Sequence, residues 1–353
     1  MSPEANVQKP PLHPDEFAIL LFGHAAFQYL FAACLFGLFP LLHSRPGLTK
    51  EEISESLRLQ EHPSRCLLFG LTSLRLIIKN GEGYHNCSLI NGFLERGQWK
   101  ILYDTVLFEG RIVYPGQADF AESLLTGSNI GLRSIPGDGP DLYHRLAQNR
   151  DLQEVFYNYM SSWSLLANPL LMAGFDFSKM TKLLDVGGGD ATNAIAIARA
   201  YPDVQICLLD LPGNAQVGRD RIAREGLANR IEVRESDIFA EEFPSNMDCV
   251  LFIHQLVIWP LDVCTRLLQR AHRSLRPGGK VVIFSSISDD SEDGPVMSAL
   301  DTVYFVSIPA PGGMIFAWKD YEQCLRETGF DNPRRIRCQS WTPHGILTAE
   351  KRA

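Results

Sequence analysis

Residues 182–212 carry the pattern that most restricts the fold of this chain. The apolar run KLLDV delivers Asp185 and leads into three glycines, Gly187–Gly189. A segment of helical character follows from Ala191 to Ala200, and a second apolar run, QICLLD, ends in Asp210 about 20 residues after the glycines. A strand, a turn, a helix and a further strand make a βαβ unit, and such units build parallel sheets with helices on both faces. We therefore expect an α/β fold.

The same turn has the composition of a nucleoside-binding site. Glycines let a ligand approach the backbone closely, and the helix that follows points its amino terminus, with a partial positive charge, at the same place. A carboxylate at the end of the second strand can bind the two hydroxyls of a ribose. We predict that Asp185, Gly187 and Gly189 lie against the ligand, and that Asp210 and Leu211 lie at its ribose.

The spacing of the glycines distinguishes between possible nucleoside ligands. A dinucleotide fold requires GxGxxG at the start of the helix, but Thr192 stands where the last of these glycines would be, and the chain has no GxxxxGK[ST]. A third apolar run, IEVRES, is followed by Asp237, Ile238 and Phe239, which offer a carboxylate and an apolar cover to an adenine ring. With the RPGGK turn at 276–280, this pattern favours S-adenosylmethionine.

The remaining runs complete a doubly wound, Rossmann-like sheet. Strands are predicted in DCVLFIHQ and KVVIFSS, and a closing hairpin in RRIRCQSW and HGILTAEK. From about Asp141 an amphipathic pattern predicts one helix that connects this region to the preceding one. We therefore predict a helical domain over 1–140, a connecting helix region over 141–180 and a cofactor-binding catalytic domain over 181–353.

The first third of the chain has the outline of a winged-helix module. Thr49 and Glu52 form a capping box at the start of a helix, a second helical pattern follows, and Asn80-Gly81 predicts the turn of a hairpin. Such modules can bind DNA, but a net charge of -8 argues against a nucleic-acid partner. A dimerisation platform is the alternative that we favour over an effector-sensing regulator.

Residues 17–44 contain no Asp, Glu, Lys or Arg, a length sufficient to cross a bilayer. His24, Gln28 and Pro40 interrupt this run, and its flanks have no positive-inside bias. We predict instead a helix buried in protein, most simply at a subunit interface. The eight cysteines form no CxxC pair. They predict reduced thiols in a cytoplasmic protein, with no metal site.

The quoted motifs together resemble a known group. LLDVGGGD, LLDLP, SDIF, the Trp-Pro after the fourth strand and LRPGGKVVIF are similar to S-adenosylmethionine-dependent methyltransferases of the plant caffeic-acid type and their bacterial relatives in antibiotic biosynthesis. The resemblance covers nearly the whole chain. It implies a seven-stranded catalytic domain, a homodimer and a small phenolic substrate. By position it implies that Gly187 and Gly189 line the cofactor, Asp210 holds the ribose, and Asp237 with Ile238 faces the adenine.

One part of the resemblance fails. The O-methylating members have a His-Asp-Trp triplet whose histidine takes the substrate proton, but the aligned residues here are Val257-Ile258-Trp259. Two acidic positions that cooperate with that histidine are also absent. His254 lies three residues earlier, at the carboxyl end of the strand, and with an ordinary pKa near 6.5 it could serve as a displaced base. The alternative is that His254 only hydrogen-bonds the backbone or the cofactor.

The missing histidine favours transfer of the methyl group to carbon. FIHQLVIWP and the segment after SSISDD resemble the branch that C-methylates aromatic amino acids such as tyrosine or 3-hydroxykynurenine. O-methylation with a displaced base and a non-methylating rearrangement or cyclisation are the alternatives. Asp301 or Arg145 could bind a charged substrate group or be ordinary surface residues. A stripe on the connecting helix is either core or the roof of the pocket: Phe156, Tyr159, Met160 and Trp163.

Overall fold

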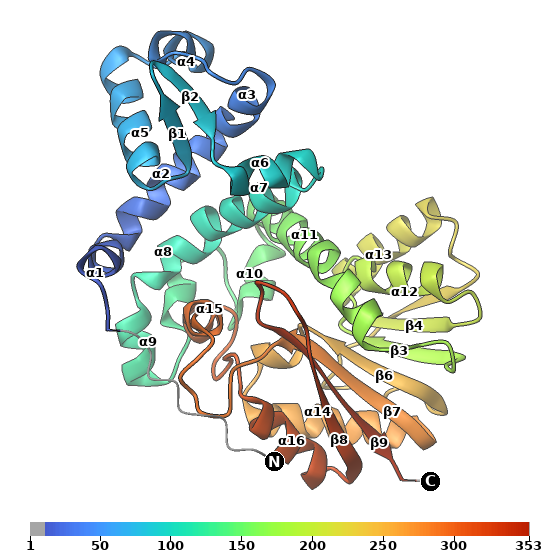
Figure 1. Ribbon diagram of the computed structural model, residues 1–353. Helices are drawn as coiled ribbons and strands as arrows, with labels where there is room; N and C mark the ends of the chain where they lie inside the picture. The colour runs from blue at the N-terminus through green and yellow to red at the C-terminus, as the bar shows by residue number, and fades with distance from the viewer. Residues whose placement is uncertain (1–10, 353) are drawn as a thin grey trace. The chain divides into compact units, whose positions relative to one another are not determined.

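The computed structural model describes residues 11–352, and the chain divides into two compact units between Leu107 and Phe108. The first unit consists of helices and one hairpin (Figure 1). Its elements are α1 (Pro14–Leu21), α2 (Gly23–Leu35), α3 (Leu38–Ser44), α4 (Lys50–Leu57), α5 (Glu61–Ser73), β1 (Ile77–Asn80), β2 (Gly83–Asn86), α6 (Ser88–Glu95) and α7 (Trp99–Phe108).

The winged-helix outline predicted for this unit is present. The Thr49 hydroxyl accepts the Glu52 N–H, and the Glu52 carboxylate accepts the Thr49 N–H at 2.8 Å, so the predicted capping box is confirmed. The hairpin is also confirmed, with Asn80 paired to Gly83 across the turn. Phe39, from α3, and other apolar side chains of α3–α5 and β1 pack into the core of the unit.

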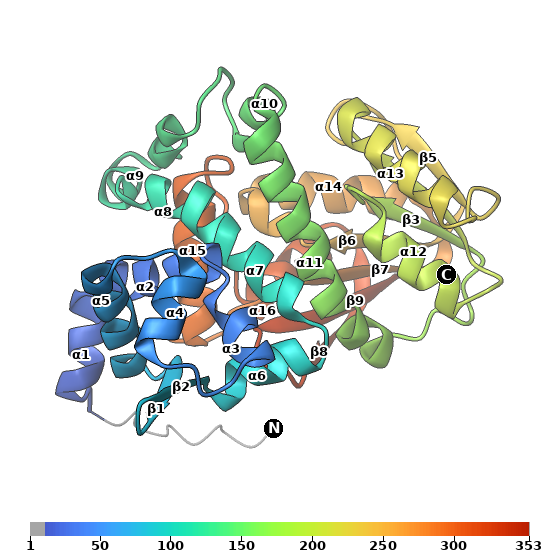
Figure 2. The ribbon, with the colours of Figure 1, turned by 90° about the horizontal axis from the view of Figure 1, so that it is seen from above.

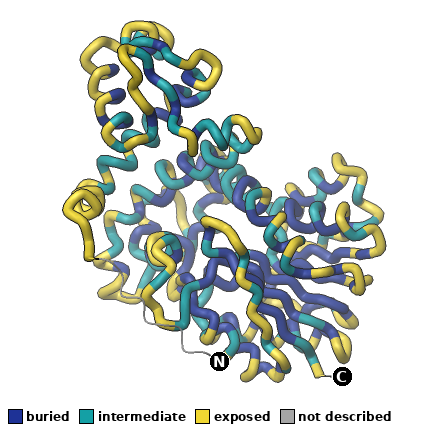
Figure 3. The backbone as a smooth tube through the Cα atoms, viewed as in Figure 1, coloured by how far each residue is buried: buried dark blue, intermediate teal, exposed yellow. Residues whose placement is uncertain are grey.

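The apolar run at 17–44 is not the single buried helix that we predicted. It forms α1, α2 and α3, because Phe22 ends the first helix and Gly37, at φ +69°, separates the second from the third. No residue of α1 is buried within the chain, and Figure 3 shows this helix exposed along its length. No single helix of the described residues is long and apolar enough to span a bilayer; only α1 and α2 taken together, bent by 72°, pass that test.

The second unit is an α/β unit whose elements are η1 (Glu109–Val113), α8 (Tyr114–Gln117), α9 (Phe120–Thr126), η2 (Ile130–Ser134), α10 (Leu142–Leu146), α11 (Arg150–Gly174), β3 (Lys182–Val186), α12 (Thr192–Ala200), β4 (Gln205–Asp210), α13 (Pro212–Arg224), β5 (Ile231–Glu235), β6 (Met247–Ile253), η3 (Leu256–Ile258), α14 (Leu261–Ser274), β7 (Leu275–Ser286), α15 (Val296–Ser307), α16 (Trp318–Glu327), β8 (Phe330–Arg337) and β9 (His344–Lys351).

Seven strands form one sheet in the order β5-β4-β3-β6-β7-β9-β8. All neighbours are parallel except β9, which runs antiparallel to β7 and β8. The predicted doubly wound α/β fold is therefore confirmed. The order reverses between β3 and β6, and ligands of such sheets bind at this switch point, outside the carboxyl ends of the strands.

The two faces of the sheet are covered because successive side chains point to opposite sides of each strand. In β7, Val281 and Ile283 pack under α14 and α16, whereas Val282 and Phe284 pack under α11 and α12. Both faces are apolar, as expected where helices cover both sides. Figures 1 and 2 show α11 lying alongside α12 and β9.

The connecting helix is interrupted, in contrast to the single helix predicted from Asp141. The chain forms α10 and then α11, because the Asn149 side chain caps the first turn of a new helix by accepting the Leu152 N–H at 3.2 Å. The short helices α8, α9 and η2 pack with α15 in the second unit. The domain limits at 140 and 180 assign roles to segments and remain predictions.

Candidate functional site

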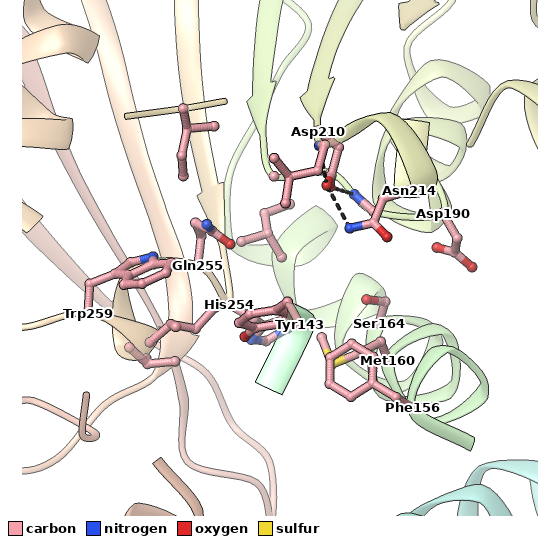
Figure 4. A pocket seen from close by; sticks show the side chains of 18 of the residues that line it. Tyr143, Phe156, Met160, Ser164, Asp190, Asp210, Asn214, His254, Gln255 and Trp259 are labelled. Atoms are coloured by element: carbon pink, nitrogen blue, oxygen red, sulfur yellow. Dashed lines mark hydrogen bonds between the residues drawn. The ribbon is translucent and has the colours of Figure 1, made fainter. Parts of the chain in front are cut away.

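A cavity of about 400 Å³ lies in the second unit at the carboxyl ends of the parallel strands. Its walls include Gly187 after β3, Leu211 after β4, Ser236 after β5 and His254 after β6. The cavity thus lies at the switch point of the sheet, where the topology predicts a ligand. Figure 4 shows part of its lining, with the Asp210 and Asn214 side chains hydrogen-bonded to each other.

The glycine turn opens onto this cavity. Gly187 and Gly189 have φ of +72° and +58°, in the left-handed region that favours glycine. A Cβ on Gly187 would lie 2.8 Å from the Gln255 amide oxygen, whereas a Cβ on Gly189 would meet no atom within 4 Å. The backbone at Gly189 therefore borders open space. Helix α12 begins at Thr192, one residue later than predicted, because Ala191 adopts φ +64° as the cap.

Asp210 is held rigidly beside the turn. Its carboxylate accepts the Gly189 N–H at 2.7 Å, the Leu211 N–H at 2.8 Å and the Asn214 amide at 2.7 Å. Tyr157 in turn donates to the Asn214 amide oxygen. Burial raises the pKa of Asp210, and these three donors oppose that shift. The arrangement fixes a buried carboxylate at the rim of the space left by Gly189.

The residues after β5 form an adjoining wall. Ile238 is buried, and the Phe239 ring packs edge-on against Trp259, with 4.9 Å between ring centroids. The exposed Asp237 carboxylate accepts the Phe239 N–H at 2.9 Å. All four side chains line the cavity. The structure therefore brings the predicted residues Asp237, Ile238 and Phe239 together, with Trp259 beside them.

Asp185 does not line the cavity. It lies beneath the turn, where a Cβ on Gly188 would approach its carboxylate to 2.7 Å. Both carboxylate oxygens are buried without a hydrogen-bond partner. Burial, with a smaller contribution from the Asp210 charge, raises the pKa of Asp185 to about 7. Its position supports the turn rather than the direct ligand contact that we predicted.

We call this half of the cavity the glycine end, defined by Gly187–Gly189, Asp210, Asn214 and Asp237–Phe239. The opposite half is aromatic, and its side chains come from α10, α11 and α15. The Tyr143 ring meets the Phe156 ring at 5.9 Å, and Tyr159 lies 6.0 Å from Trp163. We call this half the aromatic end: Tyr143, Phe156, Tyr159, Met160, Trp163, Asp301, Tyr304 and Phe305.

The stripe on the connecting helix is part of the core and also part of the cavity wall, so both interpretations apply. Phe156 and Trp163 are buried, and all four residues of the stripe line the cavity. Asp301 also lines it, whereas Arg145 does not. The Arg145 guanidinium donates to the carbonyl oxygens of Leu132 and Ile135 at 2.8 and 3.0 Å, so its donors hold the preceding loop.

His254 lines the same cavity, directly after the carboxyl end of β6. It adopts φ +53°, a strained backbone conformation for a residue other than glycine. Its backbone N–H donates to the Phe284 carbonyl oxygen at 2.9 Å. Its Nε2 is buried without a partner, and the ring lies 5.1 Å from that of His344. Burial lowers the pKa of His254 to about 4, so the imidazole is neutral at pH 7. A neutral imidazole can accept a proton.

Val257, which stands where the O-methylating members have their histidine, places an apolar side chain in the cavity wall. Val257 belongs to η3, is 2% exposed and lines the cavity. Ser285, at the end of β7, also lines the cavity, and its hydroxyl oxygen has no partner. His254 is therefore the imidazole that the β6 end contributes to this lining.

Several lining residues were missed by the sequence analysis. Asn214 lies in the first turn of α13, directly after the strand that ends in Asp210, and a polar residue at the start of this helix is a signal that could have identified it. Tyr143, Gln255 and Tyr304 come from segments where spacing carries little information.

The groups present fit S-adenosylmethionine. The open space at Gly189, the buried carboxylate of Asp210 beside it and the apolar side chain of Ile238 match a methionine chain, a ribose and an adenine ring, respectively. This fold and this cavity define the protein as an S-adenosylmethionine-dependent methyltransferase.

Comparison with known proteins identifies the family. The model of the O-methyltransferase domain matches residues 127–331, and the chain belongs to this family. It is 46% identical over 346 residues to an L-tyrosine C(3)-methyltransferase of Streptomyces lavendulae, covering 97% of this chain and 94% of that protein.

Solved structures agree with this assignment. The apo structure of the S-adenosylmethionine-dependent methyltransferase SibL matches with a TM-score of 0.86 and 43% identity, over 97% of this chain and 100% of that one. Human N-acetylserotonin methyltransferase in complex with S-adenosylmethionine matches with a TM-score of 0.84, over 98% of this chain and 100% of that one. At 21% identity, this second match is a likeness of fold.

Proposed function

We propose that this enzyme transfers a methyl group to the ring carbon next to the hydroxyl of a phenolic aromatic amino acid of the tyrosine or 3-hydroxykynurenine type. One observation carries the proposal: buried Val257 lines the cavity at the position where the O-methylating relatives have a histidine, and this removes their base. The identity of 46% to an L-tyrosine C(3)-methyltransferase supports it.

The chemistry requires less of a base than O-methylation does. S-adenosylmethionine, when bound, supplies an electrophilic methyl group on a sulfonium sulfur. A phenol would attack the methyl group through the carbon next to its oxygen while the bond from the methyl group to sulfur breaks and S-adenosylhomocysteine leaves. The ring carbon would then lose its proton to solvent, which restores the aromatic ring. Much of the rate comes from holding the two reactants in line. We assign that orientation to the rings of Tyr143, Phe156 and Tyr159.

His254 is the proposed base. Its neutral ring can accept a hydrogen bond from the phenolic hydroxyl, which increases the electron density of the aromatic ring. Burial beside His344 disfavours a full positive charge on His254, since both imidazoles lie out of water. His254 would therefore take the proton only partially, which is sufficient for attack through carbon.

For the glycine end, the proposed roles follow the geometry. Asp210 would accept the ribose hydroxyls, Gly187 and Gly189 would border the methionine part, and Asp237 with Ile238 and Phe239 would enclose the adenine. Leu211 would pack against the ribose.

The test uses L-tyrosine that carries deuterium at both ring carbons next to the hydroxyl, with S-adenosylmethionine labelled with carbon-13 in its methyl group. We expect a product that has lost one of the two deuterons and whose labelled methyl group is bonded to the ring carbon. A product that keeps both deuterons and carries the label on oxygen would reject C-methylation. 3-Hydroxykynurenine has a hydrogen on only one of the two ring carbons next to its hydroxyl, because the other carries the amino group. With deuterium at that one carbon, C-methylation should remove the deuteron, and comparing the rates of the two compounds distinguishes the two substrate types.

O-methylation with His254 as a displaced base is the second candidate. It is favoured by the match of residues 127–331 to the O-methyltransferase domain. The deuterium experiment separates it from the first candidate, because attack through oxygen leaves the ring untouched.

We further propose that the enzyme is a homodimer. Four apolar side chains at the end of α1 and just after it are 49–65% exposed, a patch that a single chain leaves in water: Ile19, Leu20, Leu21 and Phe22. Light scattering should give twice the chain mass, and Leu21→Glu should shift the protein toward the monomer. A wild-type monomer would reject this assignment.

A further inference from the structure

The carboxyl groups of the aromatic end distinguish it from the rest of the cavity. Five aspartates line the cavity, and four of them, Asp141, Asp190, Asp210 and Asp237, accept hydrogen bonds within the chain. Within the described part of the chain, the fifth, Asp301 on α15, has neither a hydrogen bond nor an ion pair. An unpaired carboxyl in such surroundings is costly unless a ligand provides its partner.

A second acid accompanies Asp301. Glu109 directly follows Phe108, whose ring stacks on Tyr159 at 3.9 Å and meets Tyr304 edge-on at 5.3 Å. Glu109 also has no hydrogen bond or ion pair among the described residues. It begins η1, a π-helical turn, and such turns are frequent at functional sites. The two acids thus flank one pair of tyrosine rings.

The surroundings offer these acids no cation. No lining residue in the described range 11–352 is Lys or Arg, and the two lining histidines, His144 and His254, are engaged elsewhere or neutral. Burial raises the pKa of Asp301 to about 7, and burial together with the charge of Asp301 raises that of Glu109 to about 8. Both carboxyls therefore lack the positive partner that would restore their ordinary ionisation.

The same cavity carries other unsatisfied polar atoms. The Ser285 hydroxyl oxygen is buried without a partner, although Ser285 lines the cavity and is only 2% exposed. The buried His254 Nε2 is also without a partner. Since buried polar groups are normally paired, these atoms indicate, independently of the acids, that a polar ligand completes the site.

We propose that Asp301, together with the neighbouring carboxyl of Glu109, binds the ammonium group of the substrate. This inference rests on the proposed function, and it deepens that function by making the free amine a requirement. The enzyme therefore acts on amino acids and amines that carry a phenol, and excludes phenols whose nitrogen is absent or acylated. Methylation then precedes any reaction that forms an amide at this nitrogen.

Binding of two simple phenols tests the proposal without turnover. Tyramine has the ammonium group and no carboxylate, whereas 3-(4-hydroxyphenyl)propionate has the carboxylate and no ammonium. Calorimetry in the presence of S-adenosylhomocysteine should show that the wild type binds tyramine more tightly than the propionate. Asp301→Asn should weaken tyramine by about tenfold to a hundredfold, the range for a hydrogen bond to a charged group, and leave the propionate unchanged or tighter. Glu109→Gln should weaken tyramine by a smaller factor.

The controls separate this role from others. Asp262→Asn, at an exposed position of α14 and paired with Arg266, should change neither affinity. Asp301→Asn should leave the affinities for S-adenosylmethionine and S-adenosylhomocysteine unchanged. A selective loss for S-adenosylmethionine would instead mean that Asp301 faces the sulfonium, and would overturn the proposal. If Asp301→Asn does not fold, Glu109→Gln carries the same comparison.

Further outcomes overturn the inference. It fails if the wild type prefers the propionate, if tyramine does not bind, or if the variants lose both phenols equally. The proposed function fails separately: tyramine binding that depends on Asp301, without methyl transfer to any phenol, would reject C-methylation and retain the ammonium site. Methylation of N-acetyltyrosine as fast as tyrosine would reject the requirement for a free amine and retain the transfer chemistry.

Discussion

The glycine end and the aromatic end of the cavity differ in how their polar groups are satisfied. Asp210 accepts three hydrogen bonds from its own chain, and Asp237 accepts one. Asp301 and Glu109 accept none in the described part of the chain, and His254 Nε2 is also unpaired. One end is therefore pre-organised before any ligand binds, whereas the other leaves its polar groups for the ligand to complete.

This difference matches the two tasks. S-adenosylmethionine is the same molecule for every member of the family, so a fixed site can bind it. The acceptor differs among relatives, and the side chains that would select it come from α10, α11 and α15 rather than from one turn. Substitutions at the two ends should consequently differ in the size of their effects, from a large loss of cofactor affinity at Asp210 to a small one at Tyr157.

The largest effect is expected from Asp210→Ala. It removes the proposed ribose acceptor and the acceptor of the Gly189 and Leu211 N–H groups. Affinity for S-adenosylhomocysteine should fall by at least about a hundredfold, because hydrogen bonds to a charged group contribute about 1.5–3 kcal/mol each. Calorimetry measures this. Asp203→Ala, exposed before β4, is the matched control, and unchanged affinity in Asp210→Ala would defeat the ribose assignment.

His254→Ala should lower turnover by about a hundredfold, within the range of general-base contributions, and leave cofactor affinity unchanged. His254→Gln, which keeps a polar side chain that cannot take the proton, should be similarly slow. Initial rates with labelled S-adenosylmethionine provide the measurement, and exposed His62→Ala is the control. Near-normal rates in both His254 variants would return this residue to a structural role.

The difference in stability between Asp301→Asn and the wild type should depend on pH. Burial raises the pKa of Asp301 from 3.8 to about 7, so between these values the folded state holds a proton that the unfolded chain has released. Stability of the wild type therefore falls as the pH rises through this window. Without ligand, Asp301→Asn should melt at a higher temperature than the wild type at pH 8, and the difference should shrink toward pH 5. A variant that melts lower at both pH values would contradict an unpaired Asp301 carboxyl with a raised pKa.

The smallest effect is expected from Tyr157→Phe. This change removes the donor to the Asn214 amide oxygen but keeps the bond from Asn214 to Asp210. A neutral hydrogen bond contributes about 0.5–1.5 kcal/mol, so the affinity for S-adenosylhomocysteine should fall about twofold to tenfold. Tyr201→Phe, whose ring packs on Phe177 away from the cavity, is the control. A loss as large as that of Asp210→Ala would mean that the glycine end is less rigid than described.

The glycine end was largely predictable from sequence because local chemistry determines it. Glycine favours the positive φ found at Gly187 and Gly189. The apolar run QICLLD places Asp210 at the carboxyl end of its strand. These signals lie within about thirty residues. We predicted Asp185 against the ligand, whereas its side chain is not part of the cavity lining. A strand pattern does not say whether a carboxylate near the end of the strand points into the turn or beneath it.

The aromatic end was predictable only in part. The stripe from Phe156 to Trp163 was visible as a helical face, but periodicity does not separate core from cavity wall. Arg145 was a plausible partner for a substrate until its donors were found on loop carbonyl oxygens. Glu109 had no signal at all in the sequence, since the charge of Asp301, which acts on it, comes from a helix far along the chain.

A crystal structure with S-adenosylhomocysteine and L-tyrosine would test the division of the cavity most directly. We expect the ribose hydroxyls on Asp210, the phenol beside His254 with the carbon next to its hydroxyl facing the sulfur, and the ammonium group on Asp301. A tyrosine bound with its hydroxyl oxygen facing the sulfur, or with its ammonium group away from both acids, would contradict this account.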